Sequence, residues 1–287
     1  MQPNRQCGRL ESGIHPSNSK ATGGFAMTPL PSLFVSHGPP NMVLDDIPTQ
    51  TALAGLGAKL PRPKGVLCIS AHWLEDKPTV SLAERPETIH DFFGFERALY
   101  EIGYPAPGDP ALARRTAALL EAAGISCDLT PDRGLDHGAW EPLMLMYPEA
   151  DVPIVQLSLQ AGADAATHHG VGRALAALRH EGILILGSGT AVHNLSQWRR
   201  DAVSTPDWAR AFDDWLAEAV TAGDNEALVN YRNVAPHAAL AHPSDEHYLP
   251  LPVAAGAASD KSPGRVLHRG FSYGSLSMAA FAFGGDG

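Results

Sequence analysis

Short apolar runs alternate along this chain with longer segments whose apolar residues recur at helical spacing. The run at 65–70, Gly-Val-Leu-Cys-Ile-Ser, is apolar almost throughout, which is typical of a strand buried on both faces of a parallel or mixed sheet. Similar runs predict further strands at 30–35, 79–83, 152–157 and 183–186.

Helical patterns separate these runs. A helix is predicted over 109–123, where Pro110 fits the first turn and Gly124 supplies a stop. Further helices are predicted at 49–60, 164–179, 207–222 and 253–258. In the segment 207–222, four apolar residues repeat at helical spacing and are expected to enter the core: Trp208, Phe212, Trp215 and Leu216.

This alternation predicts an α/β fold, a single domain with a central mixed or parallel sheet flanked by helices. The domain is expected to span 29–287. Residues 1–28 are polar and rich in Gly, Ser and Asn, so we interpret them as a disordered N-terminal extension, with Met27 a plausible native start.

Composition excludes several functional classes. A formal net charge of −10 and a pI near 5.7 argue against a nucleic-acid partner. No apolar run is long enough to cross a bilayer, so no membrane association is expected. The three cysteines form no CxxC pair, which favours a reducing, cytoplasmic location. The oligomeric state stays open.

Histidines stand at several chemically informative positions. His37 and His72 follow two predicted strands, and ligands of open α/β sheets bind at the carboxyl ends of strands. His247 lies near a predicted helix start. Neutral imidazoles from separate segments suit a borderline divalent metal, so these three residues are predicted to hold one catalytic metal ion. Glu246 is an alternative third ligand, because carboxylates bind the same metals.

Two further histidines are candidates beside the metal. His193 follows the strand at 183–186 and a glycine turn, which would bring it to the same sheet edge as His37 and His72. There it is a candidate fourth ligand or acid/base group, and the alternative is a helix-capping or core histidine. His137 lies in a predicted loop, where it faces a pocket or belongs to a structural turn, and Asp136 is a candidate to orient an imidazole.

Other residues fit no known catalytic motif. Three histidines are expected on a solvated helix face: His168, His169 and His180. Gly187-Ser188-Gly189 is no nucleophile elbow, since Leu186 stands where GxSxG needs glycine. HExxH, P-loop and GxGxxG motifs do not occur.

Seven motifs occur in order along the chain: SHGPP at 36–40, SAHW at 70–73, IHDFFGF at 89–95, YPAPG at 104–108, DHGAW at 136–140, GTAVHN at 189–194 and HPSDEHYLPL at 242–251. In content and order they resemble the bacterial and plant 4,5-DOPA dioxygenases. These are class III extradiol ring-cleavage dioxygenases, similar to the catalytic subunit of protocatechuate 4,5-dioxygenase. The resemblance covers about residues 30–280.

The resemblance implies a single-domain α/β fold and a nonhaem Fe(II) site, in which zinc can be found. It implies metal ligands at His37, His72 and His247. His193 would be an acid/base group or an additional ligand, and His137 a group beside the ligands or the substrate. Class III enzymes generally present two histidines and a carboxylate, so the role of Glu246 stays open.

The implied substrates are O2 and a catechol-type diol, DOPA-like or a related aromatic diol, whose ring opens beside the hydroxyls. His90, Phe92 and Phe93 are expected to line the aromatic pocket, although a core role for the two phenylalanines is an equal alternative. Two rival functions remain. One is a zinc-dependent hydrolase with the same ligands. The other is a non-enzymatic metal-binding protein similar to the Memo family.

Overall fold

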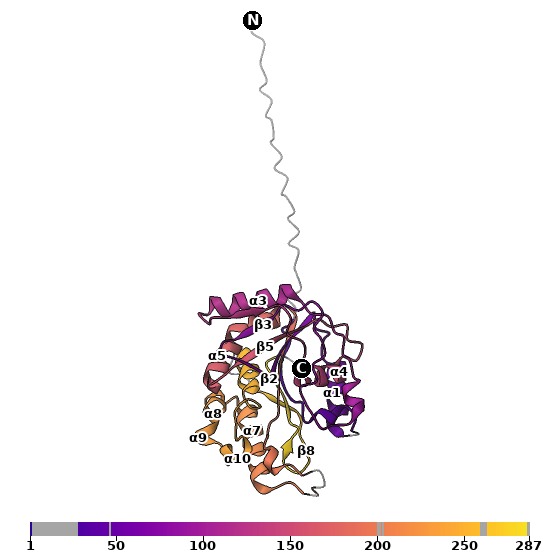
Figure 1. Ribbon diagram of the computed structural model, residues 1–287. Coiled ribbons are helices and arrows are strands. Elements are labelled where there is room, and N and C mark those ends of the chain that lie inside the picture. The colour runs from indigo at the N-terminus through magenta and orange to yellow at the C-terminus, as the bar shows by residue number, and fades with distance from the viewer. Residues whose placement is uncertain (2–27, 46, 200–201, 203, 259–262, 286–287) are drawn as a thin grey trace.

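Four parallel strands form the centre of the main sheet: β1 (Ser32–Ser36), β2 (Gly65–Glu75), β5 (Ile154–Gln160) and β6 (Ile183–Gly189). The computed structural model describes residues 1, 28–45, 47–199, 202, 204–258 and 263–285 (Figure 1). The central strands lie in the order β5-β2-β6-β1. Their nearly uniform apolar character follows from burial on both faces.

Antiparallel pairings extend the sheet on both sides. On one side, β10 (Ala280–Phe283) pairs with β1 and with β7 (Arg265–His268). On the other, β3 (Thr79–Ser81) pairs with β5 and runs parallel to β4 (Asp128–Thr130). The described residues thus form an eight-stranded mixed sheet, as the sequence predicts. A separate two-stranded sheet joins β8 (Phe271–Ser272) to β9 (Leu276–Ser277).

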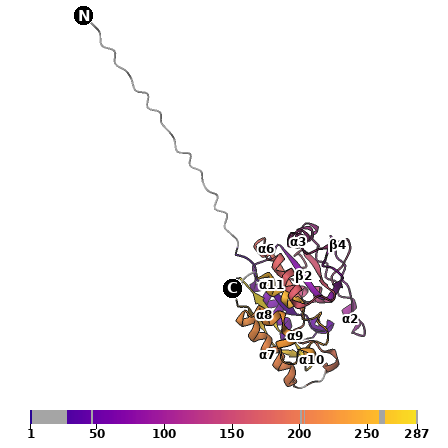
Figure 2. The ribbon, with the colours of Figure 1, turned by 90° about the vertical axis from the view of Figure 1, so that its left-hand side faces the viewer.

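Helices cover both faces of this sheet. The longer ones are α1 (Pro48–Lys59), α3 (Pro110–Ala122), α4 (His137–Met146), α5 (Ala165–Leu175), α7 (Asp207–Ala222) and α11 (Pro250–Ala257). The shorter ones are η1 (Pro40–Val43), α2 (Arg97–Tyr100), α6 (Ala177–His180), η2 (Leu195–Gln197), α8 (Asn225–Val229), α9 (Tyr231–Val234) and α10 (Ala238–Ala241). Figure 1 places α1 and α4 on one side of β2 and α5, α7 and α8 on the other. Figure 2 looks onto the face covered by α11, α8 and α7.

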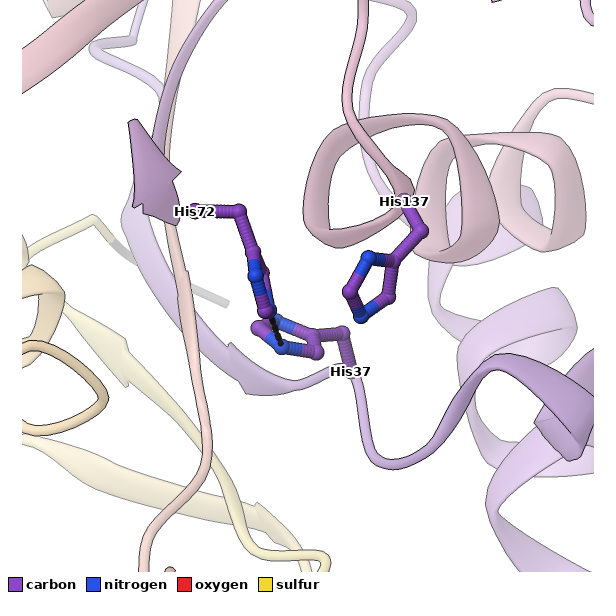
Figure 3. Close-up of side chains that lie close together, drawn as sticks. All are labelled: His37, His72 and His137. Carbon is purple, nitrogen blue, oxygen red and sulfur yellow. Dashed lines mark hydrogen bonds between the residues drawn. The ribbon is translucent and has the colours of Figure 1, made fainter. Parts of the chain in front are cut away.

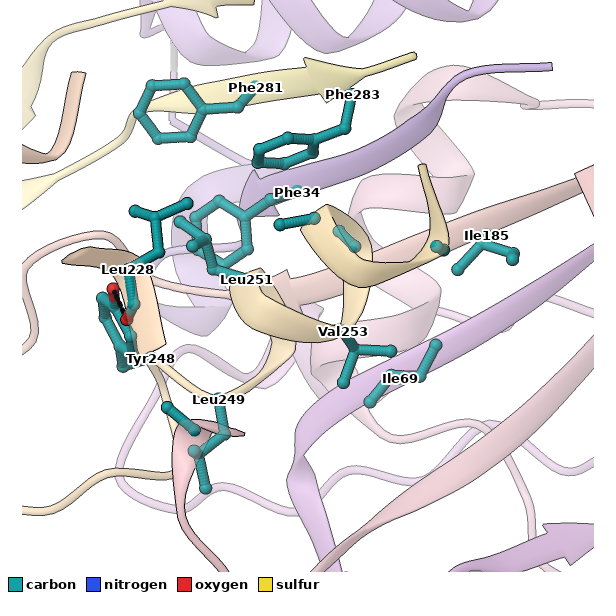
Figure 4. Close-up of a cluster of buried hydrophobic side chains, with 14 of the residues drawn as sticks. Phe34, Ile69, Ile185, Leu228, Tyr248, Leu249, Leu251, Val253, Phe281 and Phe283 are labelled. Carbon is teal, nitrogen blue, oxygen red and sulfur yellow. Dashed lines mark hydrogen bonds between the residues drawn. The ribbon is translucent and has the colours of Figure 1, made fainter. Parts of the chain in front are cut away.

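Alternate strand residues feed two apolar cores. Phe34, Ile69 and Ile185 pack with residues of α3, α5, α7 and α11 in the larger core, part of which is drawn in Figure 4. Val35 and Leu186 enter a second core with residues of α1 and α4. This alternation is the two-residue period of a strand. Apolar side chains therefore cover both faces of the sheet. Polar side chains gather where the parallel strands end.

Most predicted elements are confirmed, with shifted ends. The strand expected at 79–83 ends at Ser81, and the one expected at 183–186 continues to Gly189. The helix expected at 164–179 is divided at Ala176 into α5 and α6. The aromatic residues of α7 enter or border the larger core, as expected.

Two expectations were wrong. The segment around His137 is not a loop, because α4 begins at that residue and Asp136 caps it by accepting a hydrogen bond from the Ala139 amide. His168 is buried rather than solvated. Helix α11 also starts at Pro250, before the expected 253.

Two remaining expectations concern the chain's surroundings and its N-terminus. The extension predicted at 1–28 lies almost entirely outside the described residues. None of the helices in the described part of the chain combines the length and apolar character that crossing a bilayer requires. The cytoplasmic location stays a prediction; Cys68 and Cys127 are unpaired thiols.

Candidate metal centre and substrate cavity

Two histidines reach the site from neighbouring strands. His37 directly follows β1, and its amide donates to the Gly189 carbonyl at 2.9 Å. His72 lies inside β2 rather than after it, which corrects the predicted strand end. The pairing of β2 with β6 nevertheless stops at Ser70, so His72 emerges where the neighbouring strand has ended. Both side chains therefore reach the carboxyl edge of the sheet.

Two more histidines approach from loops. His193 follows β6, and its amide donates to the Ala241 carbonyl at 3.0 Å. His247 lies between α10 and α11, where its carbonyl accepts from the Thr190 amide at 3.0 Å. These backbone hydrogen bonds join both loops to the elements that surround the sheet edge.

The imidazole rings lie close together. The Nε2 atoms of His37 and His72 are 3.1 Å apart, as drawn in Figure 3. The ring of His247 lies 5.4 Å from that of His37 and 5.0 Å from that of His72, measured between centroids. His193 stacks on His247 at 3.5 Å with an interplanar angle of 10°. Residues from four separate segments thus share one small volume.

His137 completes the cluster from the start of α4. Its ring centroid lies 3.9 Å from that of His72 and 5.4 Å from that of His37. One nitrogen from each of these three residues lies within 4.8 Å of the others. The close approach depends on Gly138, because a β-carbon there would collide with Ser70 Oγ and press on the His37 ring.

The Nδ1 atoms of His37 and His247 have polar partners. Ser188 Oγ donates to the Gly138 carbonyl, so it accepts from His37 Nδ1 at 3.0 Å. His247 Nδ1 lies 3.2 Å from Glu246 Oε1. A hydrogen bond from Nδ1 fixes the tautomer in which Nε2 carries the free lone pair. In His37 and His247 these contacts therefore favour the tautomer whose Nε2 carries the lone pair.

Asp91 is the polar partner of Nδ1 in two further histidines, His137 and His72. Its Oδ1 accepts from the amide and the Nδ1 of His137, both at 2.9 Å. Its Oδ2 lies 3.4 Å from His72 Nδ1. Burial alone would raise the pKa of this carboxyl, but its hydrogen bonds and electrostatic interaction with His137 lower the pKa to about 2. Asp91 thus brings a negative charge beside two of the clustered imidazoles.

Asp91 was not predicted from the sequence, although it stands between His90 and Phe92 in the motif IHDFFGF. Asp136 was the expected orienting carboxylate instead. The described hydrogen bonds of Asp136 go to other partners: it caps α4 and accepts from Ser70 Oγ at 2.6 Å and from Gln156 Nε2 at 2.8 Å.

Burial favours the neutral form of four of the clustered imidazoles. It lowers the pKa of His72 to about 3 and that of His193 to about 4, and it lowers the pKa of His37 and His247 well below the ordinary value. Neighbouring histidines add to the effect for His37 and His247. Neutral imidazole is the form that binds a metal.

This donor set fits a borderline transition metal. Several imidazole nitrogens with nearby carboxylates suit Fe(II) or Zn(II), whereas Mg²⁺ and Ca²⁺ prefer a cage of oxygens. Glu246, His193 and His247 form a second set of neighbouring donors, because one potential ligand atom from each lies within 4.8 Å of the others. The predicted trio is thus divided: His37 and His72 lie in one group with His137, and His247 lies in the other with His193 and Glu246.

A cavity of about 380 Å³ opens beside the cluster. Four histidines face it: His72, His137, His193 and His247. Phe92 and Phe93 also line it, as expected. His90 is not among the described lining residues; its Nε2 donates to the Ile102 carbonyl at 3.0 Å, and its ring packs on Phe92 and Trp140. The predicted contact of His90 with substrate stays a prediction.

Other lining residues had no clear signal in the sequence. Leu195 and Trp198 enter the cavity from η2 and its C-terminal end, and Leu276 enters from β9. They are apolar residues in segments with no chemical motif. Their position depends on how the loops fold over the sheet edge.

Comparisons with known proteins agree with this geometry. Residues 31–284 match the family described as the catalytic LigB subunit of aromatic ring-opening dioxygenase. A 4,5-DOPA dioxygenase extradiol of Beta vulgaris is 44% identical over 88% of this chain and 96% of its own. A protein of the same name from Escherichia coli K12 is 42% identical over 91% of this chain and 97% of its own.

A solved structure has the same fold. It is that of an uncharacterized protein from Escherichia coli K12, with a TM-score of 0.76 and 38% sequence identity, covering 89% of this chain and 100% of that chain. The family match at 31–284 includes every segment that contributes a clustered histidine. The chain therefore belongs to the family of the catalytic LigB subunit of aromatic ring-opening dioxygenases and is an extradiol ring-cleaving dioxygenase.

Proposed function

We propose that the enzyme cleaves a catechol-type diol, DOPA or a related aromatic diol, with Fe(II) as its native metal and O2 as cosubstrate. The relatives named 4,5-DOPA dioxygenase extradiol support this substrate class. The observation that carries the proposal is the convergence of neutral imidazoles, with their Nδ1 atoms held by polar partners, beside an aromatic-lined cavity.

In this proposal His37, His72 and His247 hold the metal. A bound Fe(II) would lower the phenolic pKa of a coordinated diol and allow electrons to pass from the diol to O2. Ser188, Asp91 and Glu246 contact the Nδ1 atoms of these residues, which would leave each Nε2 free for the metal.

His193 is the proposed acid/base group. Its ring lines the cavity and stacks on His247, so a hydroxyl of a diol bound beside His247 is within reach of its nitrogens. His193 would take the hydroxyl proton and return a proton as the ring opens. His137, held by Asp91 on the opposite side of the cluster, would orient the second hydroxyl.

Anaerobic loading tests the proposal. The protein is stripped with a chelator, loaded with Fe(II) or Zn(II), and supplied with DOPA, caffeate or protocatechuate while oxygen uptake is recorded. Ring cleavage predicts uptake and a yellow product with Fe(II). His180→Ala, a change at an exposed helical histidine, is the matched control.

The rival functions give different results in the same assay. Ester or amide hydrolysis by the zinc-loaded protein, without oxygen uptake, would favour a zinc hydrolase. Metal binding with neither reaction would favour a non-enzymatic protein similar to the Memo family. The family match and the named relatives favour neither rival.

Replacement of His193 separates its two possible roles. His193→Ala is expected to retain the metal and lose about 10²- to 10⁴-fold in turnover, the contribution typical of a positioned acid/base group. Metal content and oxygen uptake are measured on the same sample. Loss of metal in parallel with activity would make His193 a ligand instead.

A further inference from the structure

The part of β2 that contains His72 departs from the regular sheet. Ile69 and Leu74 pair with residues of β5 that are only two positions apart, so the segment 70–73 bulges out of the ladder. The pairing of β2 with β6 ends at Ser70. The bulge contains His72, whose Nε2 lies 3.1 Å from that of His37 (Figure 3). The direction of the His72 side chain therefore depends on the contacts that hold this bulge.

Arg133 contacts the bulge at two points. Its Nη2 donates to the His72 carbonyl at 3.4 Å, and its guanidinium carbon lies over the Trp73 ring, 5.3 Å from the ring centroid. Trp73 is buried, and its Nε1 donates to Glu75 Oε1 at 2.8 Å. The main chain of Arg133 is also fixed, because Ser81 Oγ donates to its carbonyl at 2.7 Å. One guanidinium thus contacts the main chain of His72 and the side chain of the next residue.

Asp136 joins Arg133 to the start of the same bulge. Its Oδ2 accepts from Arg133 Nη2 at 3.2 Å, and its Oδ1 accepts from Ser70 Oγ at 2.6 Å. Ser70 Oγ in turn accepts from the His72 amide at 3.2 Å. The amide and the carbonyl of His72 are therefore both held by one network of side chains.

The ion pair makes this network sensitive to Arg133. The Asp136 side chain is fully buried, whereas that of Arg133 is 25% exposed. Removal of one partner from a buried ion pair leaves an uncompensated charge, which is strongly unfavourable. Without the guanidinium, Asp136 would move toward other donors, and Ser70 and the bulge would move with it.

We propose that Arg133 is a positioning residue for the metal centre, because it holds the β2 bulge in the shape that directs the His72 imidazole toward His37. The inference rests on the proposed role of His72 as a metal ligand. Arg133 is not among the described residues that line the cavity, and its described hydrogen bond with His72 is to the main chain. It therefore acts on the metal through His72.

Replacement of the guanidinium tests the proposal by metal binding. Arg133→Met keeps an unbranched side chain but removes every donor. Metal-free protein is titrated with Co(II), whose visible spectrum reports the number and geometry of its ligands. The affinity of Arg133→Met is expected to fall about 10- to 100-fold, as on loss of other partners that orient a ligand, and the spectrum is expected to change.

A second arginine provides the matched control. Arg269 also pairs with a buried aspartate, Asp213 of α7, and is partly exposed. Arg269→Met is expected to lower the free energy of unfolding in urea but to leave the Co(II) affinity and spectrum unchanged. Unchanged Co(II) binding in Arg133→Met, or an equal loss in both variants, would overturn the proposal.

A conservative variant covers the case in which Arg133→Met does not fold. Arg133→Lys keeps the charge beside Asp136 but lacks the planar fork that contacts the His72 carbonyl and the Trp73 ring together. Its Co(II) affinity is expected to fall about tenfold, at the lower end of the same range. An affinity equal to that of the unmodified protein would contradict the proposal.

A measurement without metal separates this inference from the proposed function. The ring ¹⁵N chemical shifts of His72 in the metal-free protein report its tautomer and its contact with Asp91. They are expected to change in Arg133→Met and to stay the same in Arg269→Met. If the unmodified protein binds neither Co(II) nor Fe(II), the proposed role of His72 as a ligand fails. The His72 signals then decide the positioning role, and unchanged signals in Arg133→Met would overturn it.

Discussion

Buried histidines occur in two kinds of surroundings in this protein. Around the cavity, the Nε2 atoms of His37 and His72 face each other at 3.1 Å, and each Nδ1 atom has a polar partner. His168 is also buried, but it donates from Nδ1 to the Asp164 carbonyl and accepts at Nε2 from the Gln160 amide. Both nitrogens of His168 are used by the backbone, so it ties the start of α5 to the end of β5.

His242 is a second example away from the cavity. Its Nε2 donates to the Ala191 carbonyl at 2.9 Å, and its ring packs among Phe212, Tyr231 and Tyr248. Burial therefore does not by itself distinguish a functional histidine from a structural one. The distinguishing feature is one nitrogen held by a partner while the other faces further free nitrogens beside a cavity.

The largest expected effect comes from removing a clustered nitrogen. His37→Ala or His72→Ala is expected to weaken metal binding by more than the roughly 10- to 100-fold typical of losing an outer hydrogen-bond partner, and to abolish oxygen uptake. His168→Ala is the matched control. It is expected to keep the metal and lower the free energy of unfolding by about 1–3 kcal/mol, because it leaves buried backbone groups unpaired. Metal titration measures the change in metal binding, and urea unfolding measures the change in stability. Loss of metal in His168→Ala would contradict the distinction between clustered and structural histidines.

A smaller effect is expected from the residue that orients two clustered rings. Asp91→Asn keeps the side-chain size but presents an NH₂ donor, so it cannot accept from both His137 and His72. Metal affinity is expected to fall about 10- to 100-fold. Competition with a chelating dye measures it on the unloaded protein. Asp128→Asn, on the exposed edge strand β4, is the control and is expected to change nothing. Unchanged affinity in Asp91→Asn would mean that the rings orient without it.

A third effect, on stability in acid rather than on metal binding, is expected from His242. Burial lowers the pKa of His242 to about 3, with Arg232 nearby adding to the shift. The folded state therefore stays unprotonated at this site while the unfolded chain takes a proton below pH ~6.5. The neutral, buried His242 therefore stabilises the folded state above that pH. This contribution to the free energy of unfolding, up to about 5 kcal/mol, is lost as the pH falls toward 3.

His242→Gln removes this titration and retains a donor for the Ala191 carbonyl. Urea unfolding at several pH values between about 8 and 4 is expected to give a shallower acid decline for the variant than for the unmodified protein. The comparison is made without metal, so that ligand protonation contributes equally to both. Parallel curves would show that His242 has no part in the acid response.

The sequence by itself determined the layered fold and the main ligand candidates. Uniform apolar runs such as 65–70 specify buried strands because a strand covered on both faces has no polar side. The ends of parallel strands meet at one edge, so the position of His37 and His72 after two such runs was enough to predict that they lie together. His247 and His193 were found because they stand in polar motifs at the boundaries of predicted elements.

Tertiary structure alone decided the partners of those histidines and the wall of the cavity. Asp91 and Ser188 act through contacts with residues distant in sequence, and no local pattern marks a carboxylate or hydroxyl that will face a ring nitrogen. Leu195 and Trp198 have the pattern of ordinary apolar residues, and only the folding of the loops over the sheet edge brings them into the cavity. Local propensity fixes elements, whereas a site is fixed by long-range packing, which a linear pattern does not encode.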